Sequence, residues 1–125
     1  MGNAINNEAS ANLMQQVVEA MQDKKANNIL SLDLRKIPNS VTDYFVICDV
    51  ASKIQAGAVY DNVLEKVKKT LGMNPFHREG LENAEWILVD YVDVVVHIFT
   101  EDTRSFYDLE GLWADAETKQ YETFN

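Results

Sequence analysis

The stretch from Glu85 to Thr100 reads EWILVDYVDVVVHIFT, and it decides the fold. Its two runs, 86–91 and 94–99, are rich in β-branched and aromatic residues and are separated by two residues, which predicts a β-hairpin. Tyr91 is then expected to lie opposite Val94, with pairing proceeding outward from the turn.

Because side chains alternate along a strand, the hairpin has two different faces. The face expected on the core carries Ile87, Val89, Tyr91, Val94, Val96 and Ile98. The other face carries Trp86, Leu88, Asp90, Val95, His97 and Phe99. This second face has two interpretations. Either it packs under a helix with Asp90 and His97 hydrogen-bonded, or it is partly open and binds a partner, as aromatic residues beside polar groups indicate.

The rest of the chain predicts helices and strands on either side of this hairpin. Helices are expected from the N-cap Ser10 to about Lys25, from the N-cap Ser52 to Gly72, and from Thr100 to about Trp113. Strands are expected at Ile29–Leu34 and Tyr44–Val50, and residues 73–85 as a loop. This order predicts a single α/β domain with a mixed β-sheet flanked by helices.

Composition and charge limit the size of the domain and the kinds of partner that it can bind. The 125 residues suit one domain, which we expect at 10–113, with a flexible leader at 1–9 and a polar, frayed tail at 114–125. The net charge of −9 opposes nucleic-acid binding and favours a basic protein partner, although charge that only maintains solubility fits equally well. We expect a cytoplasmic protein that contacts no membrane, because no long apolar run, signal peptide or transit peptide is evident.

Catalytic chemistry is not expected. Asp90 and Asp93 could suggest a metal-binding pair, but the hairpin places one on a face and the other in the turn. The glycines are scattered, so they form no phosphate-binding loop, and neither His77 nor His97 has a second ligand at zinc spacing. Cys48 lies in an apolar run and is expected to be a buried thiol. We therefore expect no catalytic, cofactor-binding or metal-ligating residues.

Several short motifs occur in a specific order along the chain. They are DKKA at 23–26, Asp33, TDYFVI at 42–47, EG at 79–80, W-x-L-x-D-Y at 86–91, DVVVHIF at 93–99 and FYDLE–LW at 106–113. From about Val17 to Trp113 the chain thereby resembles the ribosomal silencing factor family, RsfS, also called Iojap. Two positions depart from that family. The segment DVAS at 49–52 has fewer glycines than usual, and Val92 stands where a glycine or another turn residue is common. Since valine tolerates a positive φ poorly, we expect a different turn there.

The resemblance implies a nucleotidyltransferase-like fold without catalytic residues, in a bacterial protein. It implies binding to the large ribosomal subunit, on protein fourteen of that subunit, which would block joining of the small subunit and slow translation when nutrients are scarce. It also implies a homodimer when free. Two alternatives remain open: a large-subunit assembly factor, and a degenerate nucleotidyltransferase-like protein that still binds nucleotide.

Partner-binding residues are expected mainly on the second face of the hairpin. Trp86 would be the apolar anchor beside Leu88, and Asp90 would pair with a basic group of the partner. Glu79 and Gly80 would add contacts at the rim. The motif matches Tyr107 and Leu109 would contact the partner, pack internally or form the dimer.

Overall fold

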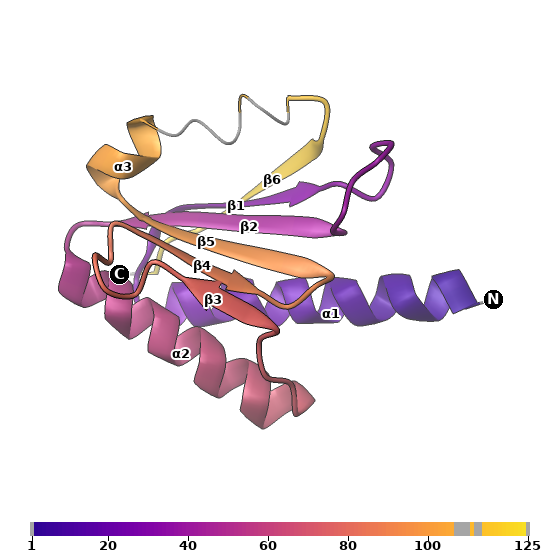
Figure 1. Cartoon of the computed structure of the whole chain (residues 1–125), viewed down its shortest axis with the longest axis horizontal. Helices are drawn as coiled ribbons and strands as arrows, with labels where there is room; N and C mark the ends of the chain where they lie inside the picture. The colour runs from indigo at the N-terminus through magenta and orange to yellow at the C-terminus, as the bar shows by residue number, and fades with distance from the viewer. Residues whose placement is uncertain (1, 107–110, 112–113, 125) are drawn as a thin grey trace.

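The computed structural model describes residues 2–106, 111 and 114–124, and Figure 1 shows the arrangement of their helices and strands. The helices are α1 (Gly2–Asp23), α2 (Lys53–Leu71) and α3 (Glu101–Phe106). The strands are β1 (Asn27–Asp33), β2 (Tyr44–Val50), β3 (His77–Glu79), β4 (Trp86–Asp90), β5 (Val94–Thr100) and β6 (Glu117–Tyr121). Within the described ranges, no helix combines the length and the hydropathy needed to cross a membrane.

The strands form one mixed sheet in the order β3-β4-β5-β2-β1-β6, which confirms the predicted α/β class. The central strands β2 and β5 are parallel, from Tyr44 beside Val94 to Val50 beside Thr100, and the other neighbouring pairs are antiparallel. The parallel pair requires a crossover, which α2, β3 and β4 provide. Figure 1 shows α1 and α2 together against one face of the sheet and α3 on the opposite side.

The main core lies between the sheet and the two long helices. All six residues of the apolar hairpin face are buried in it, as their alternation predicts. Cys48 is also fully buried, and burial raises the pKa of its thiol, so it packs as a small apolar side chain.

The two ends of α2 are also those expected from the sequence. Ser52 is the N-cap, and its Oγ accepts the Gln55 N–H at 3.1 Å. Gly72 follows the helix with φ +68°, a conformation that glycine adopts without strain, and its N–H donates to the Lys68 carbonyl at 2.9 Å. The helix that supports the sheet is therefore bounded by local sequence alone.

Several predicted boundaries are wrong. Helix α1 begins at Gly2, so residues 2–9 are helical and Ser10 is a buried residue within the helix, not its N-cap. The expected loop 73–85 contains the short strand β3. Helix α3 follows Thr100 as predicted, but the remainder of its expected length lies largely outside the described residues.

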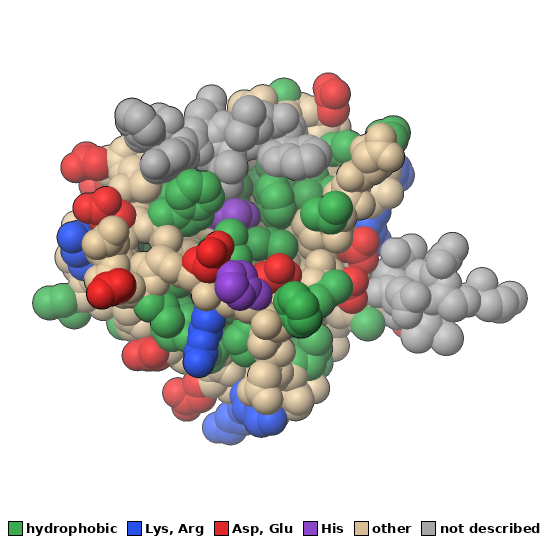
Figure 2. Space-filling view, viewed as in Figure 1, with side chains coloured by type: hydrophobic (Ala, Val, Ile, Leu, Met, Phe, Trp, Pro, Cys, Tyr) green, Lys and Arg blue, Asp and Glu red, His purple; other side chains and the backbone are tan. Residues whose placement is uncertain are grey.

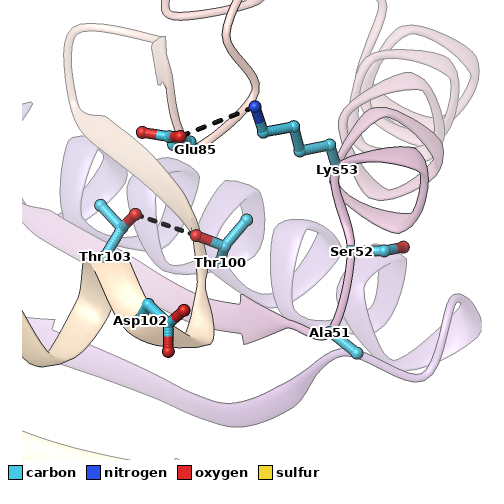
Figure 3. Close-up of a pocket in the computed structure, with 7 residues that line it drawn as sticks. All are labelled: Ala51, Ser52, Lys53, Glu85, Thr100, Asp102 and Thr103. Atoms are coloured by element: carbon cyan, nitrogen blue, oxygen red, sulfur yellow. Dashed lines mark hydrogen bonds and ion pairs between the residues drawn. The ribbon is translucent and has the colours of Figure 1, made fainter.

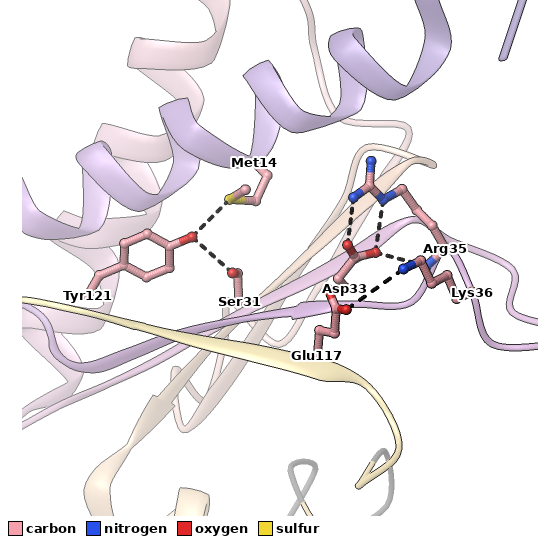
Figure 4. A network of polar contacts seen from close by, with 7 residues as sticks. All are labelled: Met14, Ser31, Asp33, Arg35, Lys36, Glu117 and Tyr121. Atoms are coloured by element: carbon pink, nitrogen blue, oxygen red, sulfur yellow. Dashed lines mark hydrogen bonds and ion pairs between the residues drawn. The ribbon is translucent and has the colours of Figure 1, made fainter. Parts of the chain in front are cut away.

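The expected frayed tail contains strand β6, which pairs with β1 from Ile29 beside Tyr121 to Asp33 beside Glu117. Figure 4 shows what fixes it: the Tyr121 hydroxyl bonds with Ser31 at 3.0 Å and donates to the sulfur of Met14 at 3.5 Å. Four of the five β6 side chains are exposed, and the backbone ladder with one tyrosine orders the strand. A polar sequence such as ETKQY therefore carries little local signal of its pairing.

The β4–β5 turn differs from the usual two-residue hairpin. Tyr91 N–H donates to the Val94 carbonyl at 2.9 Å, as expected, but Asp93 N–H donates to the Tyr91 carbonyl, also at 2.9 Å. Val92 lies between them with φ +75°, so the turn has the bonding of a classic γ-turn, which is rare and strained. Asp90 Oδ1 supports the turn by accepting the Val92 N–H at 2.7 Å.

Candidate partner-binding site

Strand pairing brings four of the predicted binding residues onto one face. Glu79 on β3 lies opposite Leu88 on β4, so the two side chains share a face with Trp86 and Asp90. The three β4 side chains are half-buried, whereas Glu79 is exposed. Figure 2 shows hydrophobic, acidic and histidine side chains next to one another on the side of the molecule where β3 and β4 lie. This strip at one edge of the sheet is the β4 strip (Trp86, Leu88, Asp90, Glu79).

The centre of the same sheet face is closed by a second apolar cluster. It contains Leu30, Leu32, Leu34, Ile47 and Phe99, with Ile37, Phe45, Trp86 and Ala116 packed against it. The hairpin's second face is therefore divided: Phe99 and His97 are buried, whereas the β4 strip is half-buried to exposed, and partner binding by this strip remains a prediction. Among the residues that the structure describes, Leu88 belongs to neither packed cluster.

Trp86 joins these two regions. Its indole Nε1–H donates to Nδ1 of His97 at 3.0 Å, and its ring centroid lies 5.0 Å from that of Phe99 at an interplanar angle of 31°. One side of the ring therefore packs inward while the residue as a whole stays half-buried. A half-buried tryptophan with its polar N–H satisfied internally can present its apolar surface to a partner without an unpaired donor.

His97 is a neutral side chain in this structure. It is 4% exposed, and burial lowers its pKa from 6.5 to about 4. A neutral imidazole that accepts at Nδ1 carries its proton on Nε2. That Nε2–H has no hydrogen-bond partner among the described residues.

Gly80 has a structural reason to be glycine. Its φ is +84°, and a Cβ at this position would lie 1.9 Å from the Trp86 carbonyl oxygen. Its carbonyl accepts the Ala84 N–H at 2.9 Å, which closes the turn between β3 and β4. Gly80 thus sets the approach of β3 to β4, and its predicted rim contact remains a prediction. Tyr107 and Leu109 lie outside the described residues.

A buried polar network holds α3 to the sheet, and sequence reasoning missed it. Arg104 Nη1 lies 3.1 Å from Asp49 Oδ2, and their side chains are only 12% and 5% exposed. Asn28 Nδ2 donates to the same carboxylate oxygen at 3.0 Å, and its carbonyl accepts from Arg104. The residues of this network are far apart in the sequence. The one local signal of a buried polar contact was an aspartate inside an apolar strand.

A polar hollow of about 560 Å³ opens at the carboxyl ends of the parallel strands β2 and β5, where α/β proteins commonly bind ligands. Figure 3 shows Lys53 Nζ directed to Glu85 at 3.6 Å, with the Asp102 carboxylate on the same rim. These two carboxylates oppose a phosphate group, so the hollow does not favour a nucleotide. In the part of the chain that is described, no group of three His, Cys, Asp or Glu side chains could hold a metal ion.

Comparisons with known proteins identify the family of this chain. A family model described as "Ribosomal silencing factor during starvation" matches residues 7–125. This match extends past both ends of the domain expected from the sequence, 10–113. The ribosomal silencing factor of Halalkalibacterium halodurans is 41% identical over 110 residues, covering 88% of this chain and 92% of that protein. That of Bacillus subtilis is 43% identical over 97 residues, covering 78% and 80%.

The fold is also shared with solved structures. The crystal structure of a protein from Chromobacterium violaceum superposes with a TM-score of 0.79 at 32% identity, over 91% of this chain and 90% of that one. Sequence and structure thus agree over nearly the whole length, and they lead to one conclusion: this chain belongs to the ribosomal silencing factor (RsfS) family.

Proposed function

We propose that this protein represses translation by binding the large ribosomal subunit, at protein fourteen, and blocking joining of the small subunit when nutrients are scarce. It acts in the cytoplasm, catalyses no reaction and is a homodimer when free. Its membership in a family named for ribosomal silencing during starvation supports the proposal. The structural observation that carries it is the β4 strip, where an aromatic, an aliphatic and an acidic side chain stay half-buried beside a closed core.

The β4 strip has the chemistry of a protein interface with a basic partner. Trp86 would supply the aromatic anchor, and Leu88 would extend the apolar contact along β4. Asp90 places a carboxylate at one end of this contact, and Glu79 places another beside Leu88 on the neighbouring strand. The net charge of −9 adds long-range attraction to a basic ribosomal protein.

Sedimentation with separated ribosomal subunits tests the proposal directly. The protein is expected to migrate with the large subunit and to prevent that subunit from joining the small one. Leu88→Ser is the sharpest variant, because Leu88 packs in neither apolar cluster and its loss should weaken binding without unfolding the chain. Ile54→Ser is the matched control, since Ile54 is 88% exposed on α2 and is not part of the strip. Normal co-migration of Leu88→Ser would contradict this assignment of the site.

The charge contribution is tested at Asp90. Reversing its charge would also remove the acceptor for the Val92 N–H, so Asp90→Asn, which keeps a side-chain oxygen, is the cleaner change. This variant should associate more slowly with the large subunit, and association of the wild-type protein should slow as salt rises. Association rates that do not change with salt would remove electrostatic steering from the proposal.

The oligomeric state is tested by light scattering. A free homodimer should have twice the 14.2 kDa mass of the chain at tens of micromolar, a concentration range in which weak interfaces of ordinary size are populated. A monomer mass throughout that range would contradict the dimer.

A further inference from the structure

Trp86 and His97 are diagonal neighbours across the β4–β5 ladder. Trp86 lies opposite Phe99, and His97 lies opposite Leu88, so the two side chains share a face two residues apart in register. The bond from the indole Nε1–H to His97 Nδ1, at 3.0 Å, crosses this diagonal. It ties a side chain of the β4 strip to a buried residue of the neighbouring strand.

His97 is itself held in one orientation. The Phe45 ring meets it edge-on, with centroids 4.8 Å apart and planes at 76°. The Phe99 ring lies nearly parallel to it, at 9° and 6.2 Å. An imidazole packed between two aromatic rings is a fixed acceptor, and the lone pair of Nδ1 points along one direction only.

We propose that His97 is a positioning residue for partner binding: its Nδ1 fixes the orientation of the Trp86 indole, so that the ring is presented to the ribosomal partner in one conformation. This inference rests on the proposed function of the β4 strip. It adds a role for a buried side chain that the partner does not touch.

Preorganisation of Trp86 has a measurable consequence for affinity. Without the His97 acceptor, the indole of Trp86 loses one of the contacts that fix its orientation and gains rotamer freedom, which the ribosomal partner must then remove. Ordering one such side chain reduces affinity roughly 2- to 10-fold. Because burial lowers the pKa of His97 to about 4, the Nδ1 acceptor is available at neutral pH. The hydrogen bond can therefore form at neutral pH.

Three substitutions separate the acceptor from the shape of the ring. His97→Phe keeps an aromatic ring but removes the acceptor, and His97→Gln moves the acceptor toward the Nε2 position. His97→Asn keeps an oxygen close to the position of Nδ1. We expect the first two to weaken large-subunit binding roughly 2- to 10-fold, and His97→Asn to restore most of it. Thermal unfolding of each variant shows which variants fold. If His97→Phe does not fold, His97→Gln takes its place as the variant without the acceptor at Nδ1.

The indole N–H resonance of Trp86 provides a readout that packing alone would not move. In ¹H–¹⁵N spectra, assigned by its loss in Trp86→Phe, this proton should be shifted and protected from solvent exchange in the wild type and in His97→Asn. Both properties should be lost in His97→Phe. A double-mutant cycle gives the coupling: His97→Phe should cost no further affinity when Trp86 is already phenylalanine.

The outcomes distinguish the two proposals. If Leu88→Ser loses binding while folded His97→Phe and His97→Gln bind like the wild type, the positioning role is wrong and the β4 strip stands. If Leu88→Ser and Trp86→Phe both bind normally, the strip is not the binding site and the positioning role falls with it. Loss of binding in His97→Phe with rescue by His97→Asn supports the inference.

Discussion

The buried imidazole of His97 predicts how the stability of this protein depends on pH. In the unfolded chain a histidine titrates near pH 6.5, whereas in the folded protein burial lowers the pKa of His97 to about 4. Between these two values the unfolded state binds more protons than the folded state. Stability is therefore fully present above about pH 6.5 and is lost as the pH falls toward 4.

The magnitude follows from the two pKa values. Between pH 7 and pH 5, the preference of the unfolded state for the proton should lower the free energy of unfolding by about 2 kcal/mol. Below pH 5 the measurement becomes difficult, since the sequence pI of about 4.5 removes the net charge that keeps the protein in solution. The interval from pH 5 to 7 therefore contains most of the effect that can be measured.

Urea unfolding at half-unit intervals of pH measures this free energy, with His97→Phe and His97→Asn as comparisons. Neither replacement titrates, so both variants should lose about 2 kcal/mol less than the wild type over the interval. The absolute stability of each variant does not matter, because only the change with pH is compared. Equal losses in all three proteins would show that His97 is not a buried neutral base and does not cause the pH dependence.

Three further changes test the fold. Val92→Gly should raise the free energy of unfolding by about 0.5–1 kcal/mol, because relief of the left-handed backbone outweighs the greater entropy of unfolded glycine. The control Val41→Gly, at an exposed position, should not raise it, and the melting temperatures of the two variants test this difference. Arg104→Met should cost about 3–5 kcal/mol by leaving Asp49 buried without its cation, and adding Asp49→Asn should recover part of that loss in urea unfolding. Gly80→Ala should cost about 3 kcal/mol, from its positive φ and the clash of the new Cβ with a backbone carbonyl, and a smaller loss in calorimetry would refute the close approach.

The elements with strong local patterns could be predicted from the sequence. The hairpin of β4 and β5 follows from two runs of β-branched and aromatic residues separated by two residues, and its register is the one expected. Helix α2 follows from its caps, Ser52 and Gly72, whose side-chain and backbone chemistry acts within a few residues. Two of the family motifs, at 86–91 and 93–99, lie in this hairpin, and their order with the other motifs along the chain allowed the family to be predicted.

The edge strands of the sheet could not be predicted, because they are held in place by strands that are distant in the sequence. Strand β3 reads HRE with every side chain exposed, and β6 reads ETKQY with one half-buried tyrosine. Neither has an apolar face to reveal it. At the other end of the chain, Ser10 is a good cap by type, but it is buried within α1, and tertiary packing overrides its local preference.

The candidate site was predictable in position but not in detail. Alternation placed Trp86, Leu88 and Asp90 on one face, and pairing with β3 added Glu79. The bond between Trp86 and His97 depends on two rotamers, which no sequence pattern specifies. The Asp49–Arg104 pair joins a strand to a helix 55 positions later, so it also lay beyond local reasoning.

The pairing of β6 with β1 has a consequence for how the protein is made. On a translating ribosome, β1 emerges long before its outer neighbour: the chain from Asp33 to Glu117 takes roughly 4 to 17 s to synthesise at about 5–20 residues per second. During that interval the outer edge of β1, from Ile29 to Asp33, lacks its final partner and is open to other nascent chains. A member of the ribosomal silencing factor family thus completes this side of its sheet only after β6 has been synthesised, and until then β1 is an edge that chaperones have reason to cover.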